Sequence, residues 1–132
     1  MLFIIYCGLL VRFTLLDRPA TISRYEIRPF WALWELAVGG PEGVKGIVWY
    51  LENVALFIPF GMLLSARGMK LKSVVLLGFI TSLAIELIQY ITALGLAELD
   101  DLTANTIGAI LGYLTFAAMC TLYRRIRRRG DV

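Results

Sequence analysis

The chain has 132 residues and a formal net charge of +3, which is long enough for one domain and too short for two ordinary ones. Hydrophobic residues make up 59% of it and its mean hydropathy is +0.76, whereas a soluble domain is about 45–50% apolar. It contains no histidine. This composition indicates a membrane protein and excludes Ser-His-Asp and Cys-His nucleophiles, zinc sites with histidine ligands and haem held by histidine.

Four apolar stretches meet or approach the roughly 20 residues that cross a hydrocarbon core about 30 Å thick. The first and shortest contains Arg12, so we expect a short, tilted membrane helix that carries Arg12 near one end. The four stretches are 2–16, 47–65, 73–97 and 104–123. We therefore predict an all-α membrane protein with a single domain over residues 1–132, arranged as a bundle of about four transmembrane helices.

The long connection between the first two stretches, residues 17–46, contains four basic and four acidic residues. Its middle part places Phe30, Trp31 and Trp34 together in a short amphipathic pattern. Aromatic clusters of this kind lie at the level of the lipid headgroups. The segment is therefore either interfacial or a lid packed on the bundle, and the sequence favours neither.

Basic residues in the short loops predict the orientation. Arg67, Lys70 and Lys72 follow the second stretch, and the tail 124–132 contains five arginines, whereas the connection "ELDDL" has three acids and no base. Because basic loops face the cytoplasm, we expect both termini to be cytoplasmic and residues 17–46 to be external. We interpret the arginine tail as a topology signal with some affinity for anionic lipid, and expect no nucleic-acid partner.

Polar residues inside the predicted helices all fall in the outer half of the bundle. They are Arg12, Glu52, Asn53, Glu86, Gln89 and Asn105. Glu86 and Gln89 share one helical face, and Glu86 lies roughly 16 Å inside the outer end expected at Ala97. A carboxylate near the bilayer centre costs about 2.5–3.5 kcal/mol, so it must face the bundle interior, a partner or water. We expect a polar pocket that opens to the outside.

If this pocket is catalytic, carboxylates must do the chemistry. Glu86 would act as general acid or base, and Asp101 as its partner or as a ligand for Mg²⁺ or Ca²⁺; no other cofactor is predicted. The remaining polar residues would bind the ligand: Arg12, Glu52, Asn53, Gln89 and Asn105.

Four further residues are expected to shape the helices. Pro59 lacks an N–H, so it frees a backbone carbonyl and bends the second helix, and Gly61 softens the next turn. Gly108 and Gly112 lie on one stripe with Asp101, where small residues let a neighbouring helix approach closely.

Each polar residue also has a structural interpretation. Asp100 or Asp101 would cap the fourth helix, Asn105 would join two helices by a hydrogen bond, and Glu52 would reach the interface. Glu86 is too deep to reach the interface, although it would be tolerated as a protonated, hydrogen-bonded structural acid.

Three blocks, "ENVALFIPFGMLL" (52–64), "AIELIQYI" (84–91) and "DDLTANTIGAILGYL" (100–114), resemble in order and spacing the signature blocks of the VanZ-like family of small bacterial membrane proteins; "IRPFWAL" (27–33) resembles its N-terminal loop block. The resemblance implies a multi-pass protein of the bacterial plasma membrane that acts at the cell envelope. The namesake of the family is associated with low-level resistance to the glycopeptide teicoplanin. The resemblance carries over these candidate positions: Asn53, Pro59, Glu86, Gln89, Asp101 and Asn105.

One departure from the family pattern bears on the function. Family members commonly have an arginine shortly before the acidic block, where this chain has Gly95 and Leu96. If that arginine binds an anion, this chain must supply the charge from Arg12, Arg24 or Arg28, or lack that function.

Three functions remain open at this point. The first is a binding or catalytic site for membrane lipid or a lipid-linked cell-wall precursor. The second is a structural or regulatory protein whose polar residues only fix helix packing. The third is ion or proton transport, which the apolar cytoplasmic halves of the helices argue against for a monomer.

Overall fold

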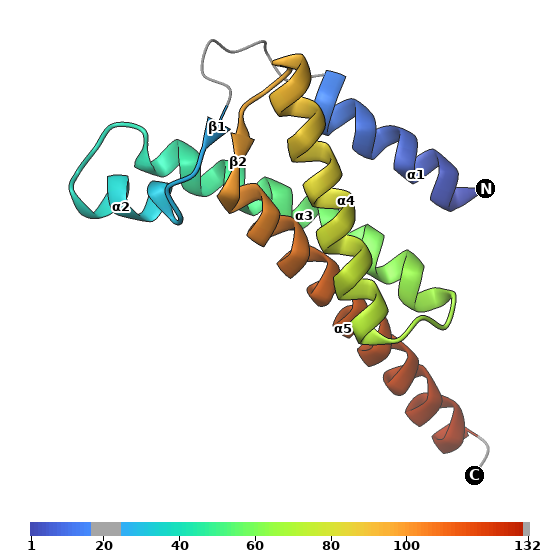
Figure 1. Ribbon diagram of the computed structural model, residues 1–132. Helices are drawn as coiled ribbons and strands as arrows, with labels where there is room; N and C mark the ends of the chain where they lie inside the picture. Colours follow the sequence, from blue (N-terminus) through green and yellow to red (C-terminus); the bar gives the residue numbers. More distant parts are fainter. Residues whose placement is uncertain (17–24, 131–132) are drawn as a thin grey trace.

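The computed structural model describes residues 1–16 and 25–130, and Figure 1 shows them as a set of helices with one short strand pair. The elements are α1 (Leu2–Val11), the π-helical turn η1 (Arg12–Leu16), β1 (Tyr25–Glu26), α2 (Trp31–Ala37), α3 (Gly43–Ala66), α4 (Leu71–Thr92), β2 (Ala97–Glu98) and α5 (Leu99–Gly130). The predicted all-α architecture is therefore confirmed.

Three helices within this described part are long and apolar enough to cross a membrane, namely α3, α4 and α5 as far as Arg128. Many of their large apolar side chains are exposed, such as Leu51, Leu87 and Leu114, as expected where lipid rather than water surrounds the helices. The helix Phe3–Leu16 is apolar but shorter, so its passage across the membrane stays a prediction.

Helices α3 and α5 run side by side in the same direction, and glycines bring their backbones together (Figure 1). A Cβ atom would lie 2.2 Å from the Val54 carbonyl oxygen at Gly108 and 2.0 Å from the Ile58 carbonyl oxygen at Gly112. At Gly61, a Cβ atom would lie 2.0 Å from the carbonyl oxygen of Ala109. Any larger side chain on these faces would therefore force the two helices apart.

Helix α4 packs antiparallel on α5, and α1 lies against α3. The Tyr6 hydroxyl donates a hydrogen bond to the Leu56 carbonyl, and the Arg67 guanidinium lies 4.3 Å from the centre of the Phe3 ring. The start of α1 is thus beside the end of α3. A small apolar core joins the four helices: Leu10, Leu15, Phe57, Phe60, Leu64, Val74, Ile85 and Ala109.

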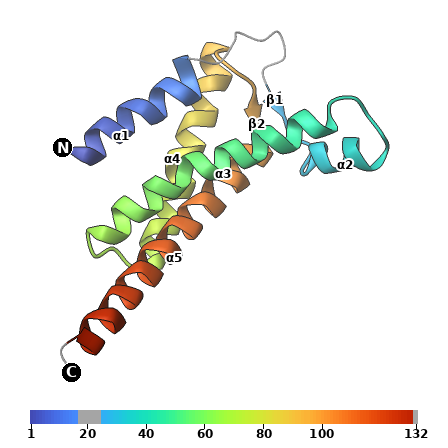
Figure 2. The same ribbon diagram turned by 180° about the vertical axis from the view of Figure 1, so that it is seen from behind.

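Residues 25 and 26 lie against the bundle at the junction of α4 and α5. Strand β1 pairs in parallel with β2, so that Tyr25 lies opposite Ala97 and Glu26 opposite Glu98. Helix α2 then packs on the N-terminal part of α3, as Figure 2 shows from behind. We call residues 25–38 the loop segment.

Several predicted boundaries were wrong. Helix α4 ends at Thr92 rather than at residue 97, because Ala93 and Gly95 adopt positive φ angles of 57° and 91°. Helix α3 begins at Gly43, four residues earlier than predicted. The described part of the arginine tail continues α5 as a helix to Gly130, because arginine favours helix and no proline or glycine interrupts the run.

A buried polar cluster at the junction of the helices

Six buried polar side chains from three helices meet near the end of α4 and the start of α5. This buried polar cluster consists of Asn53 from α3, Ser82, Glu86 and Gln89 from α4, and Asp101 and Asn105 from α5. The α4 members are four and three residues apart and the α5 members four apart, so each set occupies one helical face. Both faces turn toward the helix interface because polar groups avoid lipid.

Asp101 joins all three helices. The amide nitrogen of Asn53 donates to its carboxylate (Nδ2 to Oδ1, 2.5 Å). The Ser82 hydroxyl lies 3.5 Å from the backbone carbonyl oxygen of Asp101. It accepts a hydrogen bond from the Asn105 amide nitrogen at 2.9 Å. These contacts fix the register of α3, α4 and α5 at one level.

Glu86 and Gln89 each make a hydrogen bond to a backbone group. The Oε2 atom of Glu86 accepts the N–H of Glu98 at 2.8 Å, which holds β2 against α4. The amide nitrogen of Gln89 donates to the carbonyl oxygen of Thr14 at 2.9 Å. That carbonyl lies within the π-helical turn η1, where the wider winding alters the ordinary backbone pairing.

Two amide oxygens in the cluster accept no hydrogen bond. Gln89 and Asn105 are each 1% exposed, and within the described residues neither the Oε1 atom of Gln89 nor the Oδ1 atom of Asn105 has a partner. A buried polar atom without a partner costs about 1–3 kcal/mol. A further hydrogen-bond donor that reached either oxygen would therefore be stabilising.

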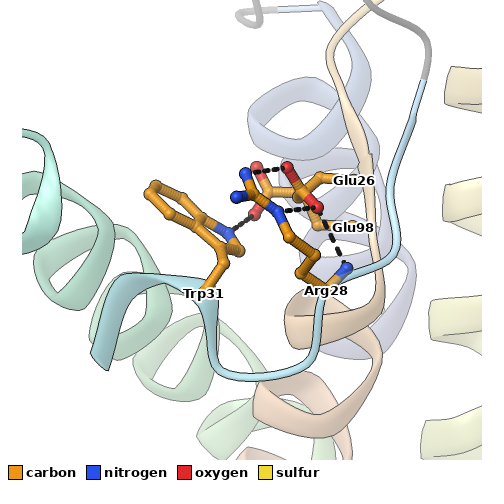
Figure 3. A network of polar contacts seen from close by, with 4 residues as sticks. All are labelled: Glu26, Arg28, Trp31 and Glu98. Carbon is orange, nitrogen blue, oxygen red and sulfur yellow. Dashed lines mark hydrogen bonds and ion pairs between the residues drawn. The ribbon is translucent and has the colours of Figure 1, made fainter. Parts of the chain in front are cut away.

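The loop segment is attached beside the cluster through Glu98 and Asp100. The indole nitrogen of Trp31 donates to Glu98 Oε2 at 2.9 Å (Figure 3). The backbone N–H of Phe30 donates to Asp100 Oδ1 at 2.7 Å, and Phe30 has the left-handed φ of 55°. Glu98 thus contacts Trp31 with its side chain and Glu86 with its backbone.

A second contact in the loop segment orders Arg28. Its guanidinium donates to both carboxylate oxygens of Glu26, at 3.0 and 2.7 Å, as Figure 3 shows. This hydrogen bonding lowers the pKa of Glu26 from its ordinary value of 4.5 and raises the pKa of Arg28. The Arg28 guanidinium is therefore bound to Glu26 within the loop segment.

Two cavities flank the attached loop segment. A groove of about 180 Å³ is lined by three acidic residues, Glu26, Glu86 and Glu98. Its other walls are formed by largely apolar side chains: Tyr25, Ile27, Leu83, Ala97, Leu99 and Leu102. A pocket of about 200 Å³ lies on the other side, between α2, α3 and the start of α5, and reaches Asp100. Both combine apolar walls with buried carboxylates, as a site for an amphipathic molecule requires.

The structure does not bring every predicted site residue into the cluster. The Glu52 side chain is exposed on α3, because it precedes the buried Asn53 and points about 100° away around the helix. Arg12 begins η1 with an exposed side chain, and Arg24 lies outside the described residues. Because α4 ends at Thr92, Glu86 is about 9 Å from the end of its helix, closer than predicted.

Pro59, which was expected to bend the second helix, lies away from the buried polar cluster. Pro59 is exposed within a continuous α3 and lines an apolar groove beside α1. The helical turn around Pro59 is therefore not part of the cluster.

No group of three or more acidic or cysteine side chains in the described ranges is arranged to hold a metal ion. A divalent cation at Glu86 and Asp101 stays a prediction.

Sequence reasoning missed several members of the site. Ser82 could have been found, since it lies four residues before Glu86 on the same helical face. Glu98 and Asp100 were read as loop and cap acids, whereas they bind Trp31 and the Phe30 backbone. The contact between Gln89 and Thr14 could not be predicted from the sequence, because every residue has a backbone carbonyl and nothing in the sequence shows which one a side chain will reach.

Comparison with known proteins places these features in a family. The family model described as VanZ/LLP1 matches residues 3–122. A relative named Protein VanZ, from Enterococcus faecium, is 38% identical over 64 residues, which are 47% of this chain and 40% of the relative. The match therefore spans less than half of that relative. No solved structure matches the chain significantly.

Proposed function

The chain belongs to the VanZ/LLP1 family, and we propose that it is a cell-envelope protein of the bacterial plasma membrane that binds an amphipathic ligand. The ligand would be a membrane lipid or a lipid-linked cell-wall precursor, with its polar part at the buried polar cluster. Both termini would be cytoplasmic, and the cluster would lie toward the outside.

One observation carries this proposal. The groove beside the loop segment joins an apolar surface to two buried carboxylates, Glu86 and Glu98. Helical bundles build ligand sites from inward-facing side chains of neighbouring helices, and intramembrane ionisable residues are costly enough to indicate function. The polar end of an amphipathic molecule would contact the carboxylates of such a groove, and its apolar end would contact the apolar side chains.

The proposed orientation is supported by the distribution of charge. The basic residues that follow α3 and those that end α5 lie at the opposite end of these helices from Asp100 and Asp101, which begin α5. Basic loops remain in the cytoplasm during insertion. The cluster would therefore face the outer leaflet, where cell-wall precursors are used.

The resemblance to teicoplanin-resistance proteins supplies the first assay. Expression of the chain would be tested for reduced teicoplanin susceptibility and for protection against envelope stress. Glu86→Gln and Asp101→Asn would each remove an acidic group while keeping its shape, and we expect both to lose the phenotype at unchanged protein level. Glu52→Gln removes an exposed carboxylate outside the cluster and should retain it.

The alternative is a structural or regulatory protein that binds nothing at the cluster. It is favoured by the hydrogen bonds from Asn53, Gln89 and Asn105, because these already join different elements of the bundle. It requires that any loss of phenotype follow a loss of protein. Full activity of both Glu86→Gln and Asp101→Asn would exclude a catalytic or binding role for these carboxylates.

A further inference from the structure

A second groove lies along the first half of α4, toward the opposite end of the helix from Glu86 and Gln89. It has a volume of about 440 Å³, and five residues of α4 and one of α5 line it: Leu71, Lys72, Val75, Leu76, Phe79 and Thr106. The Thr106 hydroxyl donates to the Leu102 carbonyl oxygen of its own helix at 2.8 Å. Among these lining residues Lys72 alone carries a charge, and the rest of the wall is largely apolar.

The groove has the depth of one lipid leaflet. Its α4 residues form one stripe along the helix, from the second residue of α4, Lys72, to Phe79. These seven steps cover about 10 Å at 1.5 Å per residue, whereas one leaflet contributes about half of a hydrocarbon core that is about 30 Å thick. The groove therefore matches the acyl chain of a lipid in a single leaflet, with Lys72 at the end nearer the membrane surface.

The charge around the Lys72 end has one sign. Arg67 and Lys70 precede Lys72 in the connection between α3 and α4, and residues 53–85 and 102–130 contain no acid. Within the part of the chain that the structure describes, Lys72 has no ion-pair partner. Glu86 is 14 residues further along α4, which is about 21 Å. A negatively charged group at this end would therefore meet basic side chains and no carboxylate.

We propose that this groove binds an anionic phospholipid, with one acyl chain along α4 and the phosphate at the Lys72 ammonium. An ammonium offers three hydrogen-bond donors, and basic residues beside a membrane helix attract anionic head groups. A zwitterionic lipid would cover the same apolar wall without the net attraction of charge. This site is separate from the ligand proposed at the buried polar cluster, and it does not depend on which side of the membrane Lys72 faces.

Photocross-linking measures the position of the lipid and its head-group preference together. The full chain is placed in phosphatidylcholine nanodiscs with a small share of phosphatidylglycerol or phosphatidylcholine, both carrying the same photoreactive acyl chain. We expect phosphatidylglycerol to label Leu76 and Phe79 about fivefold more than phosphatidylcholine does, as one lysine at an anionic lipid surface provides. Leu87, exposed in the other half of α4, is the internal reference and should be labelled equally by both lipids.

Three variants test the part played by Lys72. Lys72→Gln removes the charge and should abolish the preference for phosphatidylglycerol at Leu76, whereas Lys72→Arg keeps the charge and should keep the preference. Lys70→Gln is the matched control, because Lys70 is basic and exposed but does not line the groove. It should leave most of the preference in place. Since Lys70 and Lys72 are both exposed, these changes leave the packing of the helices intact.

Each contrary result would overturn the proposal in a different way. Equal labelling of Leu76 and Phe79 by the two lipids in the unaltered chain would show that the groove does not distinguish anionic lipid. Full preference in Lys72→Gln would show that Lys72 does not bind the head group. Equal loss in Lys70→Gln and Lys72→Gln would assign the attraction to the basic surface as a whole. The teicoplanin and envelope-stress assays of the cluster variants are unaffected by any of these results.

Discussion

The two ends of the contact among α3, α4 and α5 are held together by opposite means. Around Gly61 and Gly112, backbone lies directly on backbone, and the neighbouring core residues are apolar. Around Asp101, side-chain amides and a carboxylate span the gap between helices. The first region is held together by close packing of backbone and apolar side chains alone. The second depends on hydrogen bonds between side chains and lies beside a groove.

The largest expected effect comes from adding a methyl group to the glycine contact. Gly112→Ala would place Cβ 2.0 Å from the Ile58 carbonyl oxygen, and overpacking of this kind costs about 1–3 kcal/mol or more. We expect a clear fall in the thermal unfolding midpoint of the purified protein. The matched control is Gly8→Ala, since nothing lies within 4 Å of a Cβ at Gly8. Equal stability of the two variants would refute the close approach.

A smaller loss of stability is expected in the polar region. Asn53→Leu removes one donor to Asp101 and should cost about 1 kcal/mol, the net contribution of a typical intramolecular hydrogen bond. The measurement is denaturant unfolding in detergent, with Glu52→Leu at the adjacent exposed position as control. A double-mutant cycle with Asp101→Asn should show coupling; strict additivity would mean that the contact contributes nothing.

The attachment of the loop segment should respond locally. Trp31→Phe removes the hydrogen bond to Glu98 and should weaken the attachment by about 0.5–1.5 kcal/mol, without changing global stability. We expect faster hydrogen exchange in residues 25–30 while α3 and α5 keep their protection. Trp34→Phe alters an exposed ring that is 68% accessible and serves as control. Unchanged exchange in Trp31→Phe would show that the indole does not hold the segment.

The smallest effect is a dependence on pH within the same segment. Because hydrogen bonding from Arg28 lowers the pKa of Glu26 below 4.5, the pair is fully stabilising above pH 4.5 and is lost as the pH falls through the lowered value. Exchange of residues 25–30 should therefore accelerate in that acidic range. Arg28→Gln should remove this dependence. The effect is small because Arg28 is 67% exposed and water screens the pair.

Much of the fold was predictable because membrane helices have a strong signal. Length and hydropathy located α3, α4 and α5, and small-residue spacing located the glycine face. The break at Thr92 was missed because hydropathy continues through Leu94 and Leu96, although Gly95 was a usable helix-ending signal. The β1–β2 pairing was missed because two residues are too few to give a period.

The candidate site was predictable only for polar residues within apolar stretches. Asn53, Glu86, Gln89 and Asn105 stood out because a polar group there is costly. Glu52 stood out for the same reason but lies outside the cluster, because hydropathy does not tell which side of a helix faces a neighbour. Glu98 and Asp100 were not predicted as members of the site, since acids in a connection or at a helix start are ordinary.

The contacts that attach the loop segment join residues far apart in the chain, and this has a consequence for biosynthesis. Phe30 meets Asp100 across 70 positions and Trp31 meets Glu98 across 67. Because a chain is made from its N-terminus, residues 25–38 leave the ribosome well before the partners they require. A nascent or truncated chain that lacks β2 and α5 therefore has no partners for these contacts, and the cluster can be completed only after α5 has been made.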